Sequence, residues 1–424
     1  MLCRNGYLLD RRTIEGCDIS ELTITPKAFY PEDSVTPFRI FAELRNGTVA
    51  VPRYWAEQRF GPAKSFHGRV SRASRLTFSG SLRPGLQADA SRVSVNTLQK
   101  NGGGVLCLPT GEGKTVVALH VACTLKVKTL VIVHKQFLVD QWAERISQFV
   151  PSARVGIIRQ KIAHVDGCDI VIGMLQSIAM RSYIPETFEG FGLVVLDEVH
   201  VVPAPVFSQA LLKVCAPCML GMSATPDRRD GLSYIIGWFI GPTFIDYQLA
   251  NRADVKVITI FVSCKIRPAS GRTATILALT RLCNDVKRND IIVKTVCDLV
   301  AAARKVIVLS DRRNHCIELY GRLSKLNVSC MPYLGGMKGH LLKESETRNV
   351  MLATFAMAKE GLDVPGLNAL VLASPRSDVV QACGRVLHGS GDPIIVDIVD
   401  QWCIGVAQFN KRKRYYVNSG FTVA

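Results

Sequence analysis

The stretch that decides the fold is Gly104-Val-Leu-Cys-Leu-Pro-Thr-Gly-Glu-Gly-Lys-Thr115. Its first five residues form an apolar run typical of a buried strand, and the segment after it, Val116–Cys123, is typical of a helix. A glycine-rich turn between them can direct backbone amides and a helix N-terminus at phosphate oxygens. Lys114 can reach the β- and γ-phosphates of a nucleotide, and the Thr115 hydroxyl can ligate Mg²⁺. We therefore predict a nucleotide-binding loop, of a variant form because Leu108 replaces the first glycine of GxxxxGK[ST]; the alternative is a chance glycine-rich turn.

Strand-like runs continue to alternate with amphipathic stretches along the rest of the chain. This alternation is the pattern of βαβ units, in which helices cover both faces of a parallel sheet. A less regular stretch at 247–273 divides the runs into two series, so we predict an α/β fold with two successive domains and a hinge. The first series has runs at 104–108, 129–133, 169–173, 193–196 and 218–221, and the second has runs at 305–309, 350–353, 369–372 and 394–398.

A second chemical motif, Asp197-Glu198-Val199-His200, directly follows the apolar run Leu193–Leu196. An aspartate after a buried strand can hold Mg²⁺ directly or through water, and the adjacent glutamate can polarise an attacking water. Hydrolysis of a phosphoanhydride requires this division of labour. Because the pair lies downstream of the phosphate loop, we predict an ATP hydrolase that uses ATP and Mg²⁺.

The composition points to a polyanionic partner. The 424 residues include 52 Lys and Arg against 35 Asp and Glu, a formal net charge of +17, which suits nucleic acid or an acidic membrane surface. The chain has 48% hydrophobic residues, which excludes a disordered protein. No apolar run approaches the ~18 residues of a membrane span, and residues 1–12 lack the apolar core of a secretory signal. We therefore expect a soluble, intracellular protein of the nucleus or cytoplasm, with no membrane partner and with reduced cysteines.

The first hundred residues differ from the rest, with turn signals at Asn46-Gly47, Gly61-Pro62 and Pro84-Gly85. They predict a small separate module with some β structure. Residues 39–92 include ten basic and three acidic residues, with aromatic residues interspersed. This region is therefore either a phosphate-binding surface with stacking side chains or a small aromatic core. The basic residues are Arg39, Arg45, Arg53, Arg59, Lys64, Arg69, Arg72, Arg75, Arg83 and Arg92, and the aromatic ones are Tyr54, Trp55, Phe60, Phe66 and Phe78.

From Leu82 to His388 the chain resembles the superfamily 2 helicases and translocases of the DExH type. Pro109–Thr115 resembles motif I of that superfamily, the P-loop, and Asp197–His200 resembles motif II as a DEVH box. The resemblance implies two tandem RecA-like parallel-sheet domains with ATP between them and nucleic acid across both. Other matches are the adenine-side element at 82–87, motif Ia at 131–136 with 141–142, motif Ib at 170–177, motif III at 223–226, motif IV at 305–313, motif V at 353–354 with 360–365, and motif VI at 381–385.

The resemblance also implies a role for each matching residue. The resemblance assigns catalytic roles to Lys114, Glu198, Gln381 and Arg385. Nucleotide binding falls to Arg83, Gln87, Thr110, Gly111, Glu112, Gly113, Lys114, Thr115, Gly361, Asp363 and Arg385, with Thr115 and Asp197 holding the metal. Contact with nucleic acid, or its coupling to ATP, falls to His134, Lys135, Gln176, His200, Ser223, Thr225 and Thr354.

Two positions depart from the family pattern. Gly85-Leu86 replaces the usual aromatic residue beside Gln87, and His388 replaces the second arginine of motif VI. A neutral histidine would supply less fixed positive charge to the γ-phosphate than an arginine. The alternatives for His388 are weak hydrolysis or a substitution that Arg385 makes harmless.

The resemblance implies an accessory module at 1–76, a first RecA-like domain at 77–250, a linker at 251–285, and a second RecA-like domain at 286–424, in a core that is expected to be monomeric. The expected function is an ATP-dependent DNA helicase or double-strand DNA translocase in transcription, repair or replication. Two alternatives remain open: an ATP-gated nucleic-acid clamp with weak hydrolysis, and an RNA helicase.

Features outside the motifs suggest a branch of the superfamily. Arg228, the Arg288-Asn289 pair and the ending from Ile395–Asp397 to Tyr415-Tyr416 resemble XPB-type and UvsW-type translocases. Val51–Gly61 is similar to an element in helicases of large DNA viruses, including the poxvirus transcript-release type. The basic run Lys411-Arg-Lys-Arg414 has three interpretations: a nucleic-acid contact, a nuclear import signal, or a solvated helix face.

Overall fold

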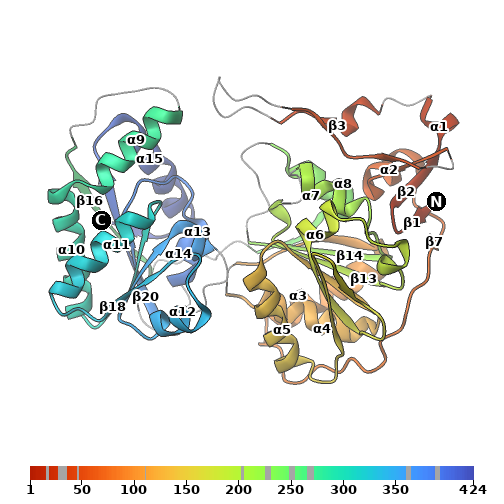
Figure 1. The fold of residues 1–424 in the computed structure, drawn as a ribbon, viewed down its shortest axis with the longest axis horizontal. Coiled ribbons are helices and arrows are strands. Elements are labelled where there is room, and N and C mark those ends of the chain that lie inside the picture. The colour runs from red at the N-terminus through yellow and green to blue at the C-terminus, as the bar shows by residue number, and fades with distance from the viewer. Residues whose placement is uncertain are drawn as a thin grey trace. The chain divides into compact units, whose positions relative to one another are not determined.

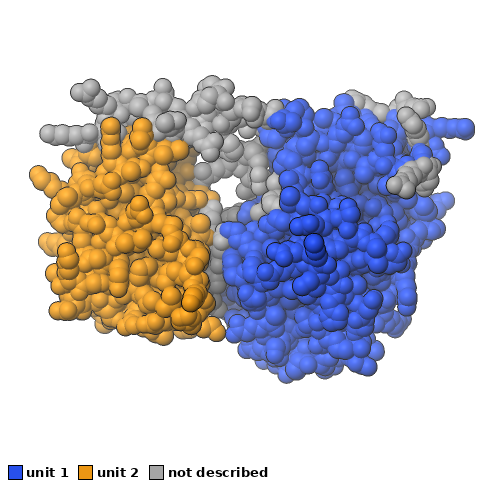
Figure 2. Space-filling view, in the orientation of Figure 1, with its two compact units in different colours: residues 1–248 blue, residues 249–424 orange. Residues whose placement is uncertain are grey.

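The computed structural model describes the chain as two compact units, Met1–Gln248 (unit 1) and Leu249–Ala424 (unit 2), coloured separately in Figure 2. It describes all residues except 16–18, 27–35, 45–46, 110, 202–204, 225–230, 248–253, 265–271, 360–363 and 387–391. Across these described residues, no helix has both the length and the hydropathy that a membrane span requires.

Unit 1 is built around an eight-stranded sheet among its described residues, in the order β11-β10-β12-β9-β13-β14-β8-β15 (Figure 1). All neighbouring strands are parallel except β10 and β11. The strands are β8 (Gly103–Cys107), β9 (Thr129–Val133), β10 (Val155–Arg159), β11 (Ile162–His164), β12 (Ile170–Met174), β13 (Leu193–Asp197), β14 (Cys218–Ser223) and β15 (Thr243–Asp246). The helices are α3 (Leu86–Asn101), α4 (Lys114–Leu125), α5 (Gln136–Phe149), α6 (Leu175–Met180), α7 (Pro205–Leu211) and α8 (Ser233–Ile240), with short 3₁₀ turns at Pro185–Phe188 and Val199–Val201.

Both faces of this sheet are buried, which explains why its central strands are apolar throughout. In β13, Val194 and Leu196 pack with α6, α7 and α8, whereas Leu193 and Val195 pack with α3, α4 and α5. Successive side chains of a strand point to opposite faces, so a strand between two layers of helices needs apolar residues at every position.

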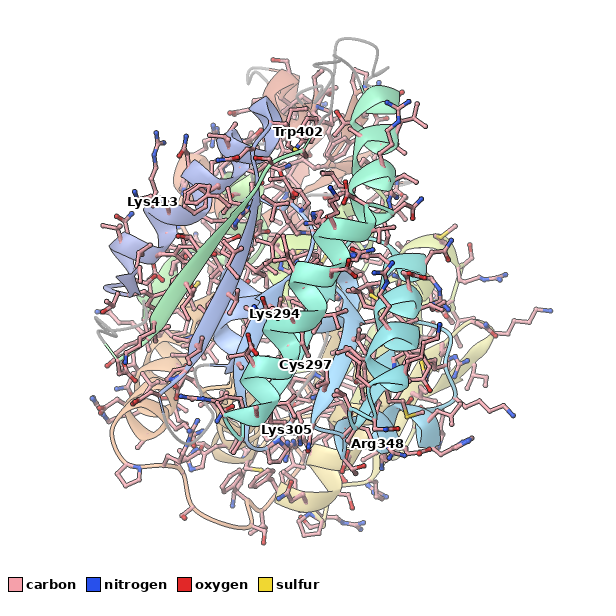
Figure 3. The ribbon with its side chains drawn as sticks, turned by 90° about the vertical axis from the view of Figure 1, so that its left-hand side faces the viewer. Lys294, Cys297, Lys305, Arg348, Trp402 and Lys413 are labelled. Atoms are coloured by element: carbon pink, nitrogen blue, oxygen red, sulfur yellow. The ribbon has the colours of Figure 1, made fainter. Side chains whose placement is uncertain are left out.

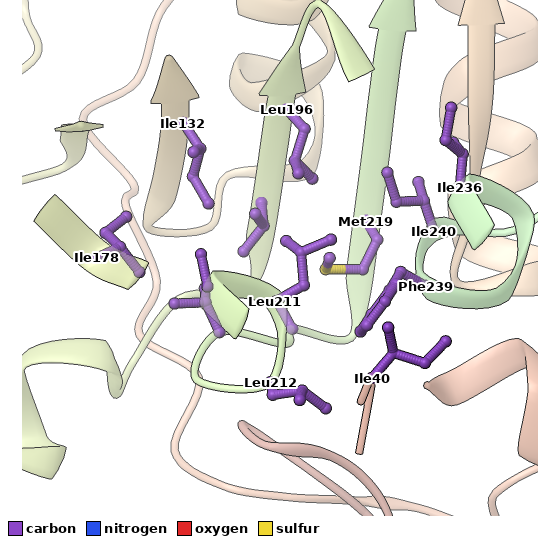
Figure 4. Packing of buried hydrophobic residues seen from close by; sticks show 14 of the residues in the cluster. Ile40, Ile132, Ile178, Leu196, Leu211, Leu212, Met219, Ile236, Phe239 and Ile240 are labelled. Carbon is purple, nitrogen blue, oxygen red and sulfur yellow. The ribbon is translucent and has the colours of Figure 1, made fainter. Parts of the chain in front are cut away.

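The N-terminal segment forms a second, five-stranded sheet in the order β5-β6-β2-β1-β7. Its core is continuous with the core of unit 1, because Ile40 and Trp55 belong to the same apolar cluster as Phe239 and Leu212, part of which Figure 4 shows. The elements are β1 (Leu2–Cys3), β2 (Gly6–Asp10), α1 (Arg11–Glu15), a 3₁₀ turn (Ser20–Leu22), β3 (Thr23–Ile24), β4 (Phe38–Arg39), β5 (Ala42–Glu43), β6 (Thr48–Val51), α2 (Arg53–Phe60) and β7 (Phe66–His67).

The described residues of unit 2 form a seven-stranded, wholly parallel sheet in the order β18-β19-β17-β20-β21-β16-β22. The strands are β16 (Lys256–Val262), β17 (Lys305–Ser310), β18 (Cys330–Tyr333), β19 (Val350–Thr354), β20 (Leu367–Leu372), β21 (Ile394–Asp400) and β22 (Thr422–Val423). The helices are α9 (Arg272–Cys283), α10 (Val286–Ala301), α11 (Arg313–Lys325), α12 (Gly339–Glu346), α13 (Phe355–Lys359), α14 (Val380–Val386) and α15 (Cys403–Asn418).

Two buried arginine–aspartate pairs tie helices of unit 2 to β21. Arg412 of α15 contacts both carboxylate oxygens of Asp397 at 2.8 Å, and the Tyr416 hydroxyl donates to the same carboxylate at 2.9 Å. Arg288 of α10 forms a similar fork with Asp400, at 2.6 and 3.0 Å. Both arginines are only 1% exposed. Each charge is therefore paired with an opposite charge inside the protein, as burial of a charge requires.

The basic run Lys411–Arg414 is thus not a uniformly solvated face. Lys411, Lys413 and Arg414 are exposed, and Lys413 extends outward from α15 (Figure 3). Arg412 points the other way, into the core. The charge run therefore contains one structural arginine that its composition alone does not distinguish.

Candidate nucleotide-binding site

The sheet order of unit 1 brings the predicted motifs to one edge. Motifs I, Ia, II and III follow β8, β9, β13 and β14, which are neighbours, and the carboxyl ends of parallel strands meet at the same edge. The register confirms this alignment, since Asp197 lies opposite Met222 and Ser223 lies opposite Cys107. The Leu108 amide also donates to the Ser223 carbonyl at 3.2 Å, which joins motifs I and III directly.

The phosphate loop depends on two glycines with positive φ. Gly111 has a φ of 83° and Gly113 a φ of 78°, where residues with a side chain are strained. A Cβ atom at Gly113 would also lie 2.3 Å from the amide nitrogen of Gln87. Gly113 is the N-cap of α4, so the loop presents the first amides of that helix, a favourable environment for phosphate.

Lys114 begins α4 and folds back over the loop. Its ammonium donates to the carbonyl oxygens of Leu108 at 2.9 Å and of Pro109 at 3.2 Å. These carbonyls hold the positive charge at the loop through bonds that a phosphate group could replace. Thr115 is the next residue, in the first turn of the same helix.

The predicted adenine-side element, 82–87, contacts the phosphate loop itself. The Gln87 amide oxygen accepts from the Arg83 backbone at 2.9 Å, and its amide nitrogen donates to the Glu112 carbonyl at 3.0 Å. The Arg83 guanidinium donates to the Gly111 carbonyl at 3.2 Å and to the Glu112 carboxylate at 3.3 Å. Gln87 is 5% exposed, so it braces the loop from a buried position.

The two carboxylates of motif II have distinct surroundings. The Trp142 indole donates to Asp197 at 2.9 Å. Burial, and then the negative charge of Glu198, raise the pKa of Asp197 to about 6, while the charge of Lys114 acts in the opposite direction. Glu198 has a left-handed φ of 54°, and its carboxylate lies 3.4 Å from the His200 ring. Such backbone strain in a residue with a side chain is typical of functional sites.

These residues fit a magnesium ion held together with a nucleotide. Mg²⁺ is usually held by one or two carboxylates, substrate phosphates and water, and not by a cage made of protein alone. A partly buried carboxylate with a raised pKa, such as Asp197, gains from a nearby cation. Asp197 and the Thr115 hydroxyl supply oxygen ligands of that kind. Within the described ranges, no cluster of three or more histidine, cysteine or acidic side chains suggests another metal site.

The residues predicted to contact nucleic acid in unit 1 follow neighbouring strands. His134 and Lys135 come after β9, and the Gln176 amide donates to the His134 carbonyl at 2.6 Å from the start of α6. Burial, and then the charge of Lys135, lower the pKa of His134 to about 4, so its ring is neutral at pH 7. Ser223, at the end of β14, is fully buried.

The residues predicted in unit 2 are partly described. Thr354 ends β19, and its hydroxyl accepts from the Met357 amide at 3.4 Å. Gln381 and Arg385 lie on α14. Outside the described residues lie Thr110, Thr225, Gly361, Asp363 and His388.

Sequence reasoning did not assign roles to two residues that the structure connects to these motifs. Trp142 was only part of the motif Ia match, yet it donates to Asp197 of motif II. Arg376 precedes motif VI and contacts Asp311. The pairing of distant segments gives no local pattern, so neither interaction could be predicted from spacing.

Comparisons with known proteins identify relatives of this chain. Residues 81–228 match the family described as "Type III restriction enzyme, res subunit". "Putative ATP-dependent RNA helicase L396" of Acanthamoeba polyphaga mimivirus is 32% identical over 428 residues, which cover 94% of this chain and 81% of that protein. "Putative helicase 161L" of Invertebrate iridescent virus 6 is 27% identical, with 90% of each chain covered. The predicted similarity to helicases of large DNA viruses is therefore confirmed.

A solved structure supports the fold class. Dbp5 of S. cerevisiae, bound to RNA and ADP BeF3, has a TM-score of 0.60 and 13% sequence identity, with 79% of this chain and 89% of that chain covered. At this identity the likeness concerns the fold alone. It confirms the prediction of two tandem RecA-like parallel-sheet domains. The N-terminal segment forms its own sheet within unit 1.

Proposed function

Because this chain belongs to the superfamily 2 helicases, we propose that it is an ATP-driven motor on duplex DNA, acting in transcription, repair or replication. As an ATP-dependent helicase it is an ATP hydrolase. The observation that carries the proposal is the carboxyl edge of unit 1, where Lys114 follows β8 and Asp197 ends β13, the two strands on either side of β14 in one parallel sheet. A motor of this superfamily needs a cation for the phosphates and a carboxylate for the metal at one place.

Each residue of this edge has a proposed task. Lys114 exchanges the carbonyls of Leu108 and Pro109 for the β- and γ-phosphates, which places its charge where negative charge develops. Thr115 and Asp197 hold Mg²⁺, which neutralises phosphate charge. Glu198 orients and polarises the attacking water. From unit 2, the family resemblance assigns Gln381, Arg385, Gly361 and Asp363 to the nucleotide and Thr354 to nucleic acid.

The basic N-terminal stretch divides into structural and free side chains. Trp55 is fully buried and Tyr54 is 8% exposed, so both belong to the core. Arg53 pairs with Glu57 at 2.9 Å and donates to the Pro217 carbonyl at 2.9 Å. Arg59 pairs with Glu21 and lies over the Trp55 ring. The alternative of a small aromatic core therefore accounts for this part of the stretch.

Three exposed arginines remain on one segment, residues 69–76, which we call the arginine strap. Arg69, Arg72 and Arg75 make no hydrogen bond or ion pair with another described side chain, although their backbone is fixed. The strap exchanges backbone hydrogen bonds with residues that precede β9 and β13: Ser71 N–H to Gly190 O at 2.8 Å, Ala73 N–H to Lys126 O at 2.9 Å, and Lys128 N–H to Ser71 O at 2.9 Å. Exposed arginines on a segment with a fixed backbone are suited to contact the phosphates of a nucleic acid.

The preference for DNA over RNA rests on the resemblance to XPB-type and UvsW-type translocases. The alternative is an RNA helicase, since the name of the mimivirus relative describes an RNA helicase. Motifs that contact the backbone do not read sequence, so binding affinity alone is a weak criterion. Turnover on each substrate is the better one.

The test compares ATP hydrolysis with duplex DNA, single-stranded DNA and RNA of equal length and sequence. Wild type is expected to respond most strongly to duplex DNA. Glu198→Gln is the matched control, because it keeps the shape and the ligands for ATP while losing the carboxylate that polarises water. It should bind ATP and nucleic acid and hydrolyse at a small fraction of the wild-type rate. Stronger stimulation by RNA would make the protein an RNA helicase, and binding without stimulation would make it a clamp.

A further inference from the structure

The segment between β20 and α14, residues 373–379, is fastened to neighbouring strands in unit 2. The Ala373 amide donates to the Leu309 carbonyl at 2.8 Å. The Asp311 amide donates to the Ser374 hydroxyl at 2.8 Å. This segment leads directly into α14, the helix that carries Gln381 and Arg385. Its position therefore determines where that helix begins.

Arg376 connects this segment with two further strand ends. Its guanidinium lies 2.5 Å from the Asp311 carboxylate, just after β17, and its Cζ atom lies 5.0 Å from the centre of the Phe355 ring. Phe355 directly follows Thr354 at the end of β19. Because β19, β17 and β20 are adjacent in the sheet, one side chain spans three neighbouring carboxyl ends.

The backbone of Arg376 is held from the opposite side. Its carbonyl accepts a hydrogen bond from the guanidinium of Arg412. Arg412 is itself fixed by its two bonds to Asp397, which also accepts from Tyr416. The buried pair of β21 and α15 thus fixes the main chain at Arg376, while the Arg376 side chain fixes the ends of β17 and β19.

The exposure of the Arg376–Asp311 pair argues against a purely stabilising role. The two side chains are 30% and 26% exposed, and ion pairs that touch water contribute little to stability. Arg322 offers a matched comparison in the same unit. It pairs with Asp290 and Glu318, each at 2.7 Å, and is 24% exposed. Its partners lie on helices, so it connects none of the motif-bearing strand ends.

We propose that Arg376 is a positioning residue that couples nucleic-acid binding to ATP hydrolysis. The inference rests on the proposed function, in which Thr354 faces nucleic acid and Gln381 and Arg385 face the nucleotide. The Arg376 guanidinium links Phe355 to the segment that leads into α14, so a displacement of Thr354 is passed toward α14. Without Arg376 the apolar packing of α13 on α14 still joins the two segments but lacks the guanidinium link, so bound nucleic acid places the residues of α14 less accurately.

The experiment measures ATP turnover with and without duplex DNA for wild type, Arg376→Ala, Arg376→Lys and Arg322→Ala, together with thermal unfolding. Arg376→Ala should lose about tenfold in DNA-stimulated kcat, a typical size for coupling between two sites, while its unstimulated kcat stays within about twofold of wild type. Arg376→Lys should fall between the two, because it keeps the charge for Asp311 but loses the planar group over Phe355. Arg322→Ala should match wild type in both rates.

Asp311→Asn supplies a second variant that removes the same ion pair with little change in shape. It should reproduce the loss of stimulation even if Arg376→Ala folds poorly. An unchanged ratio of stimulated to unstimulated kcat in Asp311→Asn and in folded Arg376→Ala would overturn the inference and leave the proposed function intact. Absence of DNA-stimulated turnover in wild type would instead refute the proposed function, and the inference with it.

Discussion

Both units surround a parallel sheet with helices, but they place their ionised side chains differently. In unit 1, Lys114, Asp197 and Glu198 lie at the carboxyl edge, where the lysine is held by backbone carbonyls that a ligand can replace. Unit 2 also buries charge under its edge, in the pairs Arg412–Asp397 and Arg288–Asp400. The same layered fold uses charge in unit 2 to fix its own helices to β21, and we propose that it uses charge in unit 1 to bind a ligand. Burying an ion pair costs desolvation energy, so we infer that the two pairs of unit 2 serve to fix the positions of α10 and α15 on β21.

The largest expected effect tests the structural use of charge in unit 2. Arg412→Met leaves the Asp397 carboxylate buried without its fork and should destabilise unit 2 by about 3–5 kcal/mol. Urea unfolding followed by fluorescence measures this loss, with Trp402 as the one tryptophan after residue 248 that reports on unit 2. The control Arg322→Met breaks half-exposed pairs and should cost less than about 1 kcal/mol. Equal costs would contradict the contrast between the units.

Next in size is the loss of the ligand-binding charge in unit 1. Lys114→Ala should lower ATP turnover by about 10²–10³-fold, as expected when one preorganised donor to developing charge is removed. Its free energy of unfolding should change little, because the hydrogen bonds of the ammonium described above run to loop carbonyls. Lys100→Ala removes the same charge from the C-terminal end of α3 and should hydrolyse ATP normally. Normal turnover by Lys114→Ala would refute the site assignment.

The arginine strap gives a third test, by nucleic-acid affinity as a function of salt. Replacing Arg69, Arg72 and Arg75 together by alanine should flatten the log–log salt slope by up to about 0.9 for each phosphate that is no longer neutralised. The matched control replaces Lys287, Lys294 and Lys325, exposed lysines of unit 2, one of which Figure 3 labels. Equal slopes in both triple variants would remove the strap from the binding surface. Deleting residues before Thr77 is a poorer test, because Trp55 and Ile40 would leave the core of unit 1.

The smallest effect concerns a neutral buried network in unit 2. The His315 ring lies 2.9 Å from both the Ser310 hydroxyl and the Asn289 amide oxygen. Burial, and then the charges of Arg288 and Arg322, lower the pKa of His315 to about 3. The folded state therefore binds this proton less readily than the unfolded state. Its stabilising contribution is complete above pH 6.5 and is lost as the pH falls toward 3, by up to about 1.4 kcal/mol per unit.

Urea unfolding of wild type and His315→Gln at pH 7 and at pH 5.5 checks this sign. The stability advantage of wild type should shrink on acidification, by about 1 kcal/mol. His134, with a pKa lowered to about 4, is present in both proteins and cancels in the difference. A constant advantage would show that His315 accepts the proton without cost.

The sequence was sufficient to predict what local pattern determines. The apolar runs predicted the central strands of both large sheets but not the outer ones, which are β10, β11 and β15 in unit 1 and β16, β18 and β22 in unit 2. Gly111, Gly113 and Lys114 marked a loop whose glycines do have positive φ. Interactions between distant segments could not be predicted. Nothing near Arg412 shows that it faces Asp397 and not solvent, and Trp55 could equally have been a stacking platform. The domain boundaries near 76, 250 and 285 stay predictions. The roles of the site residues also stay predictions, because those roles depend on bound ligands and on motion.

The buried Arg412 has a consequence for attack by proteases. Trypsin cleaves after lysine or arginine, so Lys411–Arg414 contains four successive candidate cleavage sites. The segment is helical, however, and Arg412 is buried. A protease needs an extended, accessible backbone, so cleavage there has to wait until α15 opens. When opening and reclosing are fast, the digestion rate measures the fraction of molecules in which the Arg412–Asp397 fork is open. The most basic tetrapeptide of the chain is therefore a natural reporter of the integrity of unit 2.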